Sequence, residues 1–347
     1  MNRSAGRDIA VDVIKTVAII SVLFIHCCTG GYSAPLKSSS WAAAVFWGSV
    51  SRAGVPLFLM CSGALMLPRE RELTLKKLWG RSILRLLIAL FFWAALYKVY
   101  NGLIYKTLSS QYAEASLKEL VLFRHENHLY YLHIMLLVYA FLPATRAFIR
   151  AASERETDYF LLIWFLVGIL YPTLRPYWPF RLLVGIPGQW LLNMTYASIG
   201  YGVLGYRLRR RPLKSWLAAA LAIVGFAVTM GGTVIGSIMT GGLYEHFLEG
   251  MTAGVCMLAA GIFSLCVPGS EKVSGRAAAV YAFMSKASFC VYLVHIFALK
   301  GFYLLGVTVR AAHCIVTIPA LVAAVLLVSL LVYLPISRIP WVKRWLI

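Results

Sequence analysis

The sequence predicts an all-α integral membrane protein of about ten transmembrane helices, with both termini in the cytoplasm. Its 347 residues are 61% hydrophobic and only 13% charged, and the mean hydropathy is +0.77, outside the range of ordinary soluble domains. The apolar runs are long and unbroken, as in membrane helices, whereas the strands of a membrane barrel are short and alternate in polarity. Basic residues concentrate beside these runs, mainly on the side of the N-terminus, which places both termini in the cytoplasm.

The formal net charge of +20 would suggest a nucleic-acid ligand in a soluble chain. In a membrane protein, basic residues collect in the cytoplasmic segments next to the spans and set the orientation of the chain, and this explains the excess of positive charge. We therefore expect no nucleic-acid partner. Part of the charge could hold an anionic ligand or the headgroups of membrane lipids.

Ten apolar windows are long enough to cross a bilayer. They cover residues 13–32, 41–67, 83–104, 129–148, 159–174, 189–206, 215–238, 250–267, 287–306 and 313–334. The external segment 106–126 mixes apolar and charged residues and is expected to form an amphipathic helix at the interface. We expect one domain over residues 1–347, because no separate soluble segment is long enough to fold alone.

The first window carries a stripe of ionisable groups. Asp8, Asp12 and Lys15 are spaced by four and three residues, so neighbouring pairs meet on the helix surface. Lys15 and His26 are eleven residues apart, which is three turns and leaves both side chains within about 20° of one face and roughly 16 Å apart. Such groups are costly in hydrocarbon, so the stripe should face the protein interior or a wet cavity.

Two catalytic residues are expected on this stripe, His26 as the general base and Asp12 as a second ionisable group of the same stripe. Neutral imidazole titrates near physiological pH and can take a proton from a hydroxyl. The alternative for His26 is a packing or hydrogen-bonding role, which a lone intramembrane histidine often has.

The second window is interrupted by Arg52, Gly54, Pro56, Ser62 and Gly63. These residues predict a kinked or broken helix, whose freed backbone groups are tolerable only against a cavity. Helix packing through the small residues is the alternative.

Arg81 and Arg85 are four residues apart at the cytoplasmic mouth of the third window. Guanidinium groups on one helix face could clamp phosphate oxygens in bidentate fashion. The alternative is that these arginines only flank the span on its cytoplasmic side and set the orientation of the helix.

Two further spans carry polar groups within apolar runs. His128, Tyr130 and Tyr131 open the fourth window, where an aromatic belt is normal but a carbohydrate-binding cleft would use the same side chains. In the ninth window Ser288, Tyr292 and His295 share a helix face. A hydrogen-bond network of purely structural value is the alternative there.

Motifs of soluble enzymes are absent from the sequence, which has no phosphate-binding loop, no His-Glu-x-x-His and no nucleophile elbow. The seven cysteines lack metal-ligand spacing, so no metal site is predicted.

In order along the chain, the motifs resemble the acyltransferase 3 family of bacterial membrane proteins. The resemblance rests on five blocks: Lys15 followed eleven residues later by His26, the segment VPLFLMCSGALML, the pair Arg81 and Arg85, HLYYL at 128–132, and SFCVYLVH ending at His295. The family often has Arg where this chain has Lys15, and a Trp in the motif that reads Tyr130-Tyr131 here. Lys keeps the charge but lacks the bidentate fork, so the donor geometry could differ.

The resemblance implies transfer of an acyl group, commonly acetyl from acetyl-CoA, to hydroxyls of cell-surface saccharides. It implies that His26 is the catalytic histidine and that Lys15, Arg81 and Arg85 lie on the donor side. The soluble domain of longer members is absent from this sequence, as in the compact enzymes that modify lipid-linked glycans.

The leading hypothesis is an O-acetyltransferase of the bacterial inner membrane that uses cytoplasmic acetyl-CoA and a saccharide acceptor. Donor-binding residues are expected to be Lys15, Arg52, Arg81 and Arg85, and acceptor-binding residues Ser62, His128, Tyr130, Tyr131, Ser288, Tyr292 and His295. Direct transfer and an acyl-enzyme both stay open. The rival hypotheses are a transporter or flippase with a polar transmembrane path, and transfer of another acyl group such as succinyl.

Overall fold

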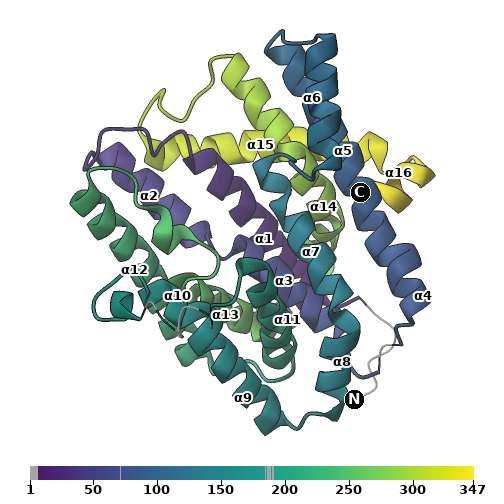
Figure 1. The fold of residues 1–347 in the computed structure, drawn as a ribbon, viewed down its shortest axis with the longest axis vertical. Coiled ribbons are helices and arrows are strands. Elements are labelled where there is room, and N and C mark those ends of the chain that lie inside the picture. Colours follow the sequence, from purple (N-terminus) through teal and green to yellow (C-terminus); the bar gives the residue numbers. More distant parts are fainter. Residues whose placement is uncertain (1–6, 71, 184, 186–188, 190) are drawn as a thin grey trace.

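A computed structural model describes residues 7–70, 72–183, 185, 189 and 191–347. Within these ranges every regular element is a helix (Figure 1). Eight helical segments are long and apolar enough to cross a membrane, and the bent pair at residues 127–151 makes a possible ninth. The predicted all-α membrane protein is therefore confirmed.

The longer helices run in chain order as α1 (Ile9–Cys28), α2 (Ser39–Ser51), α3 (Gly54–Met66), α5 (Leu84–Ile104), α6 (Ser110–Val121), α7 (Tyr130–Ala140), α8 (Leu142–Ala151), α9 (Glu154–Phe165), α11 (Met194–Arg210), α12 (Ser215–Thr240), α13 (Ala253–Gly269), α14 (Gly275–Leu304) and α15 (Cys314–Ile336). Short helices are α4 (Leu75–Lys77), α10 (Tyr171–Leu174) and α16 (Pro340–Trp345). Two π-helical turns, η1 (Leu78–Ile83) and η3 (Leu166–Leu170), and a 3₁₀ turn, η2 (Asn127–Leu129), join some of them.

The described residues contain eight or nine candidate spans, where the sequence predicts about ten. The sixth predicted window, 189–206, corresponds to α11, which has 17 residues. At 1.5 Å per residue it is about 26 Å long, slightly less than the hydrocarbon core of a bilayer. Its last turn carries Arg207, Arg209 and Arg210, and its inner face is buried among other helices. The eight or nine long segments therefore do not include it.

Helix α1 occupies the middle of the molecule, where it packs against α2, α3, α13, α14 and α15 (Figure 1). Asp8 caps its N-terminus by accepting from the backbone N–H of Ala10 at 3.1 Å. The same carboxylate accepts two hydrogen bonds from Arg209, at 3.0 and 3.1 Å, which joins the start of α1 to the end of α11. We call the face on which α1 begins the N face, and the opposite face the far face.

The long segment Ser39–Met66 is interrupted, as the sequence predicts. Helix α2 ends at Ser51 and α3 begins at Gly54, so Arg52 lies in the break between them. Glycines allow the neighbouring helices to approach closely: a Cβ at Gly54 would lie 3.1 Å from the Ala18 oxygen of α1. At Gly63 it would lie 1.8 Å from the Gly202 oxygen of α11, so no side chain fits there.

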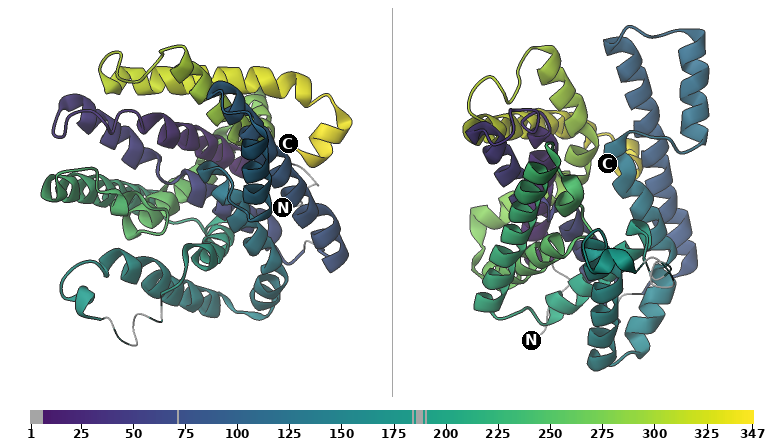
Figure 2. Two further views of the ribbon diagram at one scale, coloured as in Figure 1. Left: turned by 45° about the horizontal axis from the view of Figure 1, so that its top comes forward. Right: turned by 60° about the vertical axis from the view of Figure 1, so that its left-hand side comes forward.

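The predicted external helix within 106–126 is present as α6. It stands beside the end of α5 as an antiparallel partner at the edge of the molecule (Figure 2). Two polar contacts tie the pair together: Tyr112 donates to the Lys98 carbonyl at 2.8 Å, and Lys98 pairs with Glu119 at 2.5 Å. This hairpin leads into η2 and so positions the residues at the start of α7.

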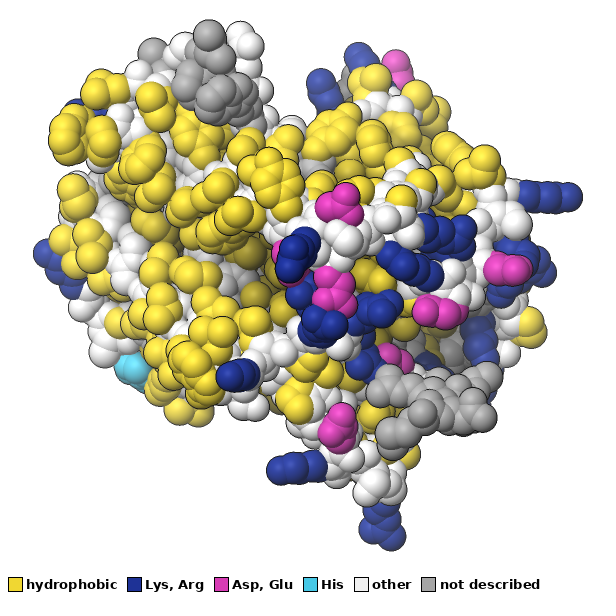
Figure 3. Space-filling view, turned by 90° about the horizontal axis from the view of Figure 1, so that it is seen from below, with side chains coloured by type: hydrophobic (Ala, Val, Ile, Leu, Met, Phe, Trp, Pro, Cys, Tyr) yellow, Lys and Arg dark blue, Asp and Glu magenta, His cyan; other side chains and the backbone are white. Residues whose placement is uncertain are grey.

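The N face is rich in charge. Seen from below in the orientation of Figure 1, Lys and Arg side chains gather with some Asp and Glu, bordered by hydrophobic side chains (Figure 3). A charged band next to an apolar surface is what a membrane protein presents where it leaves the bilayer.

Candidate active site

Two adjoining cavities lie along α1. The far cavity has a volume of about 380 Å³ and is lined by His26 and Arg52. The N-face cavity has a volume of about 350 Å³ and is lined by Lys15 and Arg85. The polar stripe of α1 thus reaches both cavities, as its helical spacing predicts.

Two tyrosines belong to the linings of both cavities. Tyr131 from α7 and Tyr292 from α14 face each other edge to face, with ring centroids 5.5 Å apart. The hydroxyl of Tyr292 donates to the His128 carbonyl at 2.6 Å, which fixes its ring against η2. These two rings therefore form the partition between the cavities.

Three histidines from three distant segments meet at the far cavity. His26 comes from α1, His128 from η2 and His295 from α14. Their ring centroids are 4.9 Å apart for His26 and His295, 5.6 Å for His128 and His295, and 6.4 Å for His26 and His128. His26 and His128 line the cavity, and His295 lies behind them, fully buried.

The hydrogen bonds of His295 define what it can offer to His26. Its Nδ1 lies 2.6 Å from the Tyr292 carbonyl, and a carbonyl only accepts, so Nδ1 carries the hydrogen in the neutral ring. Its Nε2 is then a buried acceptor, for which the described residues supply no partner. No hydrogen bond within the described ranges uses the ring nitrogens of His26. His26 is therefore free to accept a proton from the cavity, with an acceptor nitrogen close behind it.

Arg52 lies in the far cavity with His26 and not in the N-face cavity. The break between α2 and α3 carries it there, and its Nε is buried without a hydrogen-bond partner among the described residues. The sequence-based grouping of Arg52 with Lys15 and Arg85 does not match this placement. The break in the helix turns its side chain to the opposite side of the tyrosine partition.

The N-face cavity carries positive charge and has no Asp or Glu among its lining residues. Lys15, Arg85 and Lys286 supply the charge, from α1, α5 and α14. Neither Lys15 nor Lys286 forms an ion pair within the described part of the chain. Arg85 donates to the main-chain oxygen of Ile347 and lies 5.8 Å from the ring centre of Phe289. This lining suits an anion.

Arg81 is separated from Arg85. It lies in the π-helical turn η1, is exposed, and is not among the residues that line the N-face cavity. The sequence-based clamp assumed an α-helix, in which residues four apart share a face. The structure brings Arg85, on α5, into the cavity and leaves Arg81, on the preceding π-turn, exposed at its margin.

Asp12 is not brought to His26. Its carboxylate is buried and pairs with Arg7, whose guanidinium donates to it at 2.9 Å and also to the Ala282 carbonyl at 2.7 Å. Fourteen residues of helix, about 21 Å, separate Asp12 from His26. Asp12 thus joins the start of α1 to α14, and the geometry gives it no part in the histidine cluster.

The remaining residues predicted to bind substrate divide between the cavities. His128 and Tyr130 line the far cavity, and Ser62 and Ser288 line the N-face cavity. Both serine hydroxyls donate to helix carbonyls, Ser62 to Phe58 at 3.0 Å and Ser288 to Ser285 at 2.9 Å.

Sequence reasoning missed three polar residues of the far cavity. Asn127, Glu245 and Glu249 line it, the two glutamates from the connection between α12 and α13. The chain has only 13 acidic residues, so two carboxylates four apart in a short connection were a signal in the sequence. Lys286 of the N-face cavity was hidden among the other basic residues near the spans.

His125, in the connection that enters η2 and outside the candidate spans, pairs with His133 of α7. His125 Nδ1 lies 3.0 Å from His133 Nε2, and His125 Nε2 lies 3.2 Å from the Leu120 carbonyl. Burial lowers the pKa of His125, and burial raises the pKa of the neighbouring Glu126. Both shifts favour neutral side chains beside the far cavity.

Among the described residues, no group of three His, Cys, Asp or Glu side chains is arranged to hold a metal ion. The far cavity is lined by two imidazoles, a guanidinium and amide, hydroxyl and carboxylate groups. Comparison with known families decides between catalysis and transport. A family model described as an acyltransferase domain matches residues 8–335. The chain belongs to the acyltransferase 3 family.

This match covers every motif on which the resemblance rests, from Lys15 to His295. No curated protein and no solved structure gives a significant match. Membership in the acyltransferase 3 family makes this chain a membrane acyltransferase, with the two cavities as its candidate donor and acceptor sites.

Proposed function

We propose that this acyltransferase moves an acetyl group from acetyl-CoA at the N face to a hydroxyl of a saccharide at the far face. The observation that carries the proposal is the pair of adjoining cavities that share Tyr131 and Tyr292. A donor in one cavity and an acceptor in the other can meet only at this partition, beside His26.

The N-face cavity is the proposed donor site. Its lining cations, Lys15, Arg85 and Lys286, would hold the phosphates of CoA, with Arg81 adding charge at the margin. The uncharged pantetheine arm would then lie along Ser62, Ser288 and the aromatic side chains toward the partition.

His26 is the proposed general base. As the acceptor oxygen attacks the thioester carbon, His26 takes the hydroxyl proton; the C–S bond then breaks, and the CoA sulfur leaves and recovers that proton. A buried acceptor such as His295 Nε2 would hold the other ring N–H of His26 and so orient it. Attack by His26 itself to form an acyl-enzyme is the alternative route, and it uses the same residues.

Arg52 is the proposed partner of the developing negative charge. Its guanidinium lines the cavity that contains His26, and its buried Nε has no other hydrogen-bond partner in the described ranges. A fixed cation in a site that excludes water stabilises the oxyanion of the tetrahedral intermediate.

The far cavity is the proposed acceptor site. Asn127, Tyr130, Glu245 and Glu249 offer amide, hydroxyl and carboxylate groups that suit sugar hydroxyls. A saccharide linked to a lipid would reach this site from the outer leaflet of the bacterial inner membrane, if the N face is cytoplasmic.

The orientation has its own test. In intact cells a membrane-impermeant thiol reagent should label Lys106→Cys at the far face and leave Lys76→Cys at the N face unlabelled. Six of the seven native cysteines are buried and the seventh is half-buried, which keeps the background low. The opposite labelling pattern would place the donor cavity outside the cell.

The reaction is tested with purified protein in nanodiscs, radiolabelled acetyl-CoA and a panel of lipid-linked and free glycans. His26→Asn should lower kcat by about 10²- to 10⁴-fold. His313→Asn is the matched control, because His313 is exposed and caps α15, a role that Asn keeps. Full activity of His26→Asn would remove the assignment of the base. Succinyl-CoA offered in parallel tests the alternative acyl group, and glycan transport without acyl transfer would favour a flippase.

A further inference from the structure

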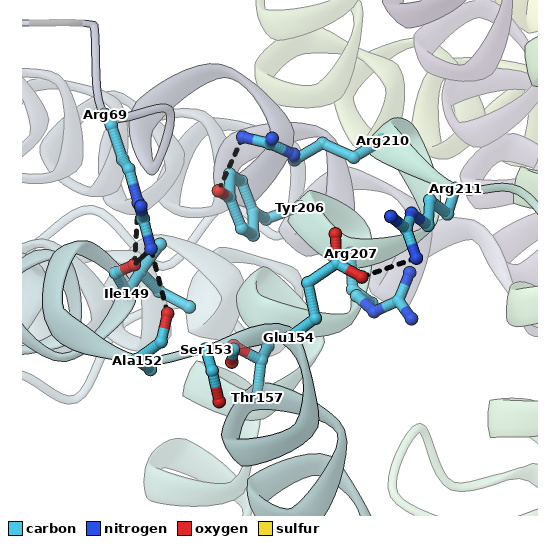
Figure 4. Close-up of a pocket in the computed structure, with 10 residues that line it drawn as sticks. All are labelled: Arg69, Ile149, Ala152, Ser153, Glu154, Thr157, Tyr206, Arg207, Arg210 and Arg211. Carbon is cyan, nitrogen blue, oxygen red and sulfur yellow. Dashed lines mark hydrogen bonds and ion pairs between the residues drawn. The ribbon is translucent and has the colours of Figure 1, made fainter.

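A third cavity lies on the N face, away from the two described above. It has a volume of about 270 Å³ and is lined by the end of α8, the start of α9, the end of α11 and Arg69 from the connection after α3 (Figure 4). None of its lining residues lines the far cavity or the N-face cavity. We call it the arginine cavity, after Arg69, Arg207, Arg210 and Arg211.

Acidic partners neutralise only part of this charge. Arg207 pairs with Asp158, at 2.6 and 2.9 Å, and Arg211 pairs with Glu154 at 2.5 Å. Neither Arg69 nor Arg210 contacts a carboxylate in the described part of the chain. The cavity therefore keeps an excess of positive charge.

The two arginines without acidic partners are held by neutral groups. Arg69 donates to the Ile149 carbonyl at 3.1 Å and to the Ala152 carbonyl at 2.8 Å, at the end of α8. Arg210 donates to the Tyr206 hydroxyl at 3.0 Å, and its guanidinium carbon lies 5.6 Å from the centre of that ring. Figure 4 shows Arg69 on one side of the cavity and the arginines of α11 on the other. Guanidinium groups on both sides of one cavity can donate hydrogen bonds to the oxygens of a phosphate that lies between them.

The surface beside the cavity is apolar. Tyr159 and Leu162 of α9 and Leu166, the first residue of η3, follow at helical spacing and are 66%, 53% and 41% exposed. This face begins two residues after Thr157, which lines the cavity. In a membrane-spanning protein, an exposed apolar face next to a basic pocket brings lipid chains and their headgroups to the same place.

We propose that the arginine cavity binds a phosphate ester, and that the apolar face of α9 makes the headgroup of an anionic phospholipid its source. A soluble nucleotide offers the same phosphate group without acyl chains. The proposal is independent of the acyl transfer, since the cavity shares no residue with the reaction site.

Arg210→Gln is the test variant, because within the described residues this arginine forms no ion pair, and its hydrogen bond and its cation–π contact are both with Tyr206. Arg276→Gln is the matched control: Arg276 is an exposed arginine of the first turn of α14 and lines none of the three cavities. The full-length protein in a neutral detergent is titrated with phosphatidylglycerol or phosphatidylcholine, and bound lipid is counted by native mass spectrometry. Arg210→Gln should bind phosphatidylglycerol about tenfold more weakly than wild type, while Arg276→Gln should match wild type.

A second arm uses adenosine 3′,5′-bisphosphate in the absence of lipid. Weakening by Arg210→Gln in this arm alone would support the phosphate site with a soluble source. Arg210→Lys keeps the charge and loses the fork, so its binding should be intermediate, and it replaces Arg210→Gln in the comparison if that variant does not fold. Equal binding of both probes by wild type, Arg210→Lys and Arg210→Gln would overturn the proposal.

Discussion

The rings of Tyr131 and Tyr292 lie edge to face with centroids 5.5 Å apart, and both line the two cavities that adjoin along α1. They come from α7 and α14, more than 150 residues apart in the chain. In the proposed reaction the acyl group stops at this pair, so the pair should limit its size.

Tyr131→Ala should enlarge the space for the acyl chain. Butyryl has two methylene groups more than acetyl, and each methylene that becomes buried contributes about 0.8 kcal/mol. The ratio of kcat/KM for butyryl-CoA to that for acetyl-CoA should therefore rise by about tenfold. Tyr131→Phe removes only the hydroxyl and should keep the wild-type ratio. An unchanged ratio in Tyr131→Ala would mean that another part of the protein selects the acyl group.

His295 is expected to act as a positioning residue for His26. Its ring centroid is 4.9 Å from that of His26, its Nδ1 is hydrogen-bonded to the Tyr292 carbonyl, and its Nε2 is buried without a hydrogen-bond partner among the described residues. His295→Ala should lower kcat by about 100-fold, as expected when a catalytic group is misplaced by about 1 Å, with little change in KM for acetyl-CoA. His295→Gln, which keeps an acceptor, should recover part of kcat. A rise in KM with unchanged kcat would contradict this role.

Lys286 is expected to contribute to donor binding through its charge. It is exposed, lines the N-face cavity and has no acidic partner in the described ranges. Lys286→Gln should weaken CoA binding by about fivefold at low salt, the effect of roughly 1 kcal/mol from one solvated charge pair, and by less at high salt. Isothermal titration at two ionic strengths measures this. Lys272→Gln, an exposed lysine that lines none of the described cavities, should bind CoA as wild type does.

The histidine pair at the far face should make stability depend on pH. Burial lowers the pKa of His125, and nearby Lys98 acts in the same direction, so the unfolded state takes up a proton first as pH falls below about 6.5. The free energy of unfolding should therefore fall as pH drops through this range. His125→Gln should show a shallower pH dependence in unfolding measurements between pH 7.5 and 5.5.

The pH dependence of wild type must be compared with that of His125→Gln, because Glu126 changes the free energy of unfolding with pH in the opposite direction. Burial raises its pKa, so its contribution to stability decreases as pH rises. If the free energy of unfolding depends on pH in the same way for wild type and His125→Gln, then the pair with His133 does not keep the His125 ring neutral.

Gly63→Ala should separate α3 from α11. The added Cβ would lie 1.8 Å from the Gly202 oxygen, and both partners are backbone atoms that cannot rotate away. We expect a loss of about 1–3 kcal/mol in thermal unfolding of the solubilised protein. A Cβ at Gly231 of α12 would have no other heavy atom within 4 Å, so Gly231→Ala should be neutral or slightly stabilising. Equal effects at the two glycines would show that the α3–α11 contact is loose.

Much of the fold follows from local sequence. Long apolar runs define most of the spans, and the break near Arg52 follows from Arg, Gly and Pro in one run. Window 189–206 does not count among the long spans because α11 is short and partly polar, which a hydropathy window with uncertain ends does not resolve.

The sequence by itself determined the membrane class, the family motifs and the stripe that carries Lys15 and His26, because helical periodicity and hydropathy are properties of neighbouring residues. The tertiary structure decided which side chains share a cavity, because those contacts join segments far apart in the chain. It brought His128 and His295 to His26 and placed Arg52 with them. It gave Asp12 a different partner, since the same helix that aligns Asp12 with His26 also holds them three to four turns apart.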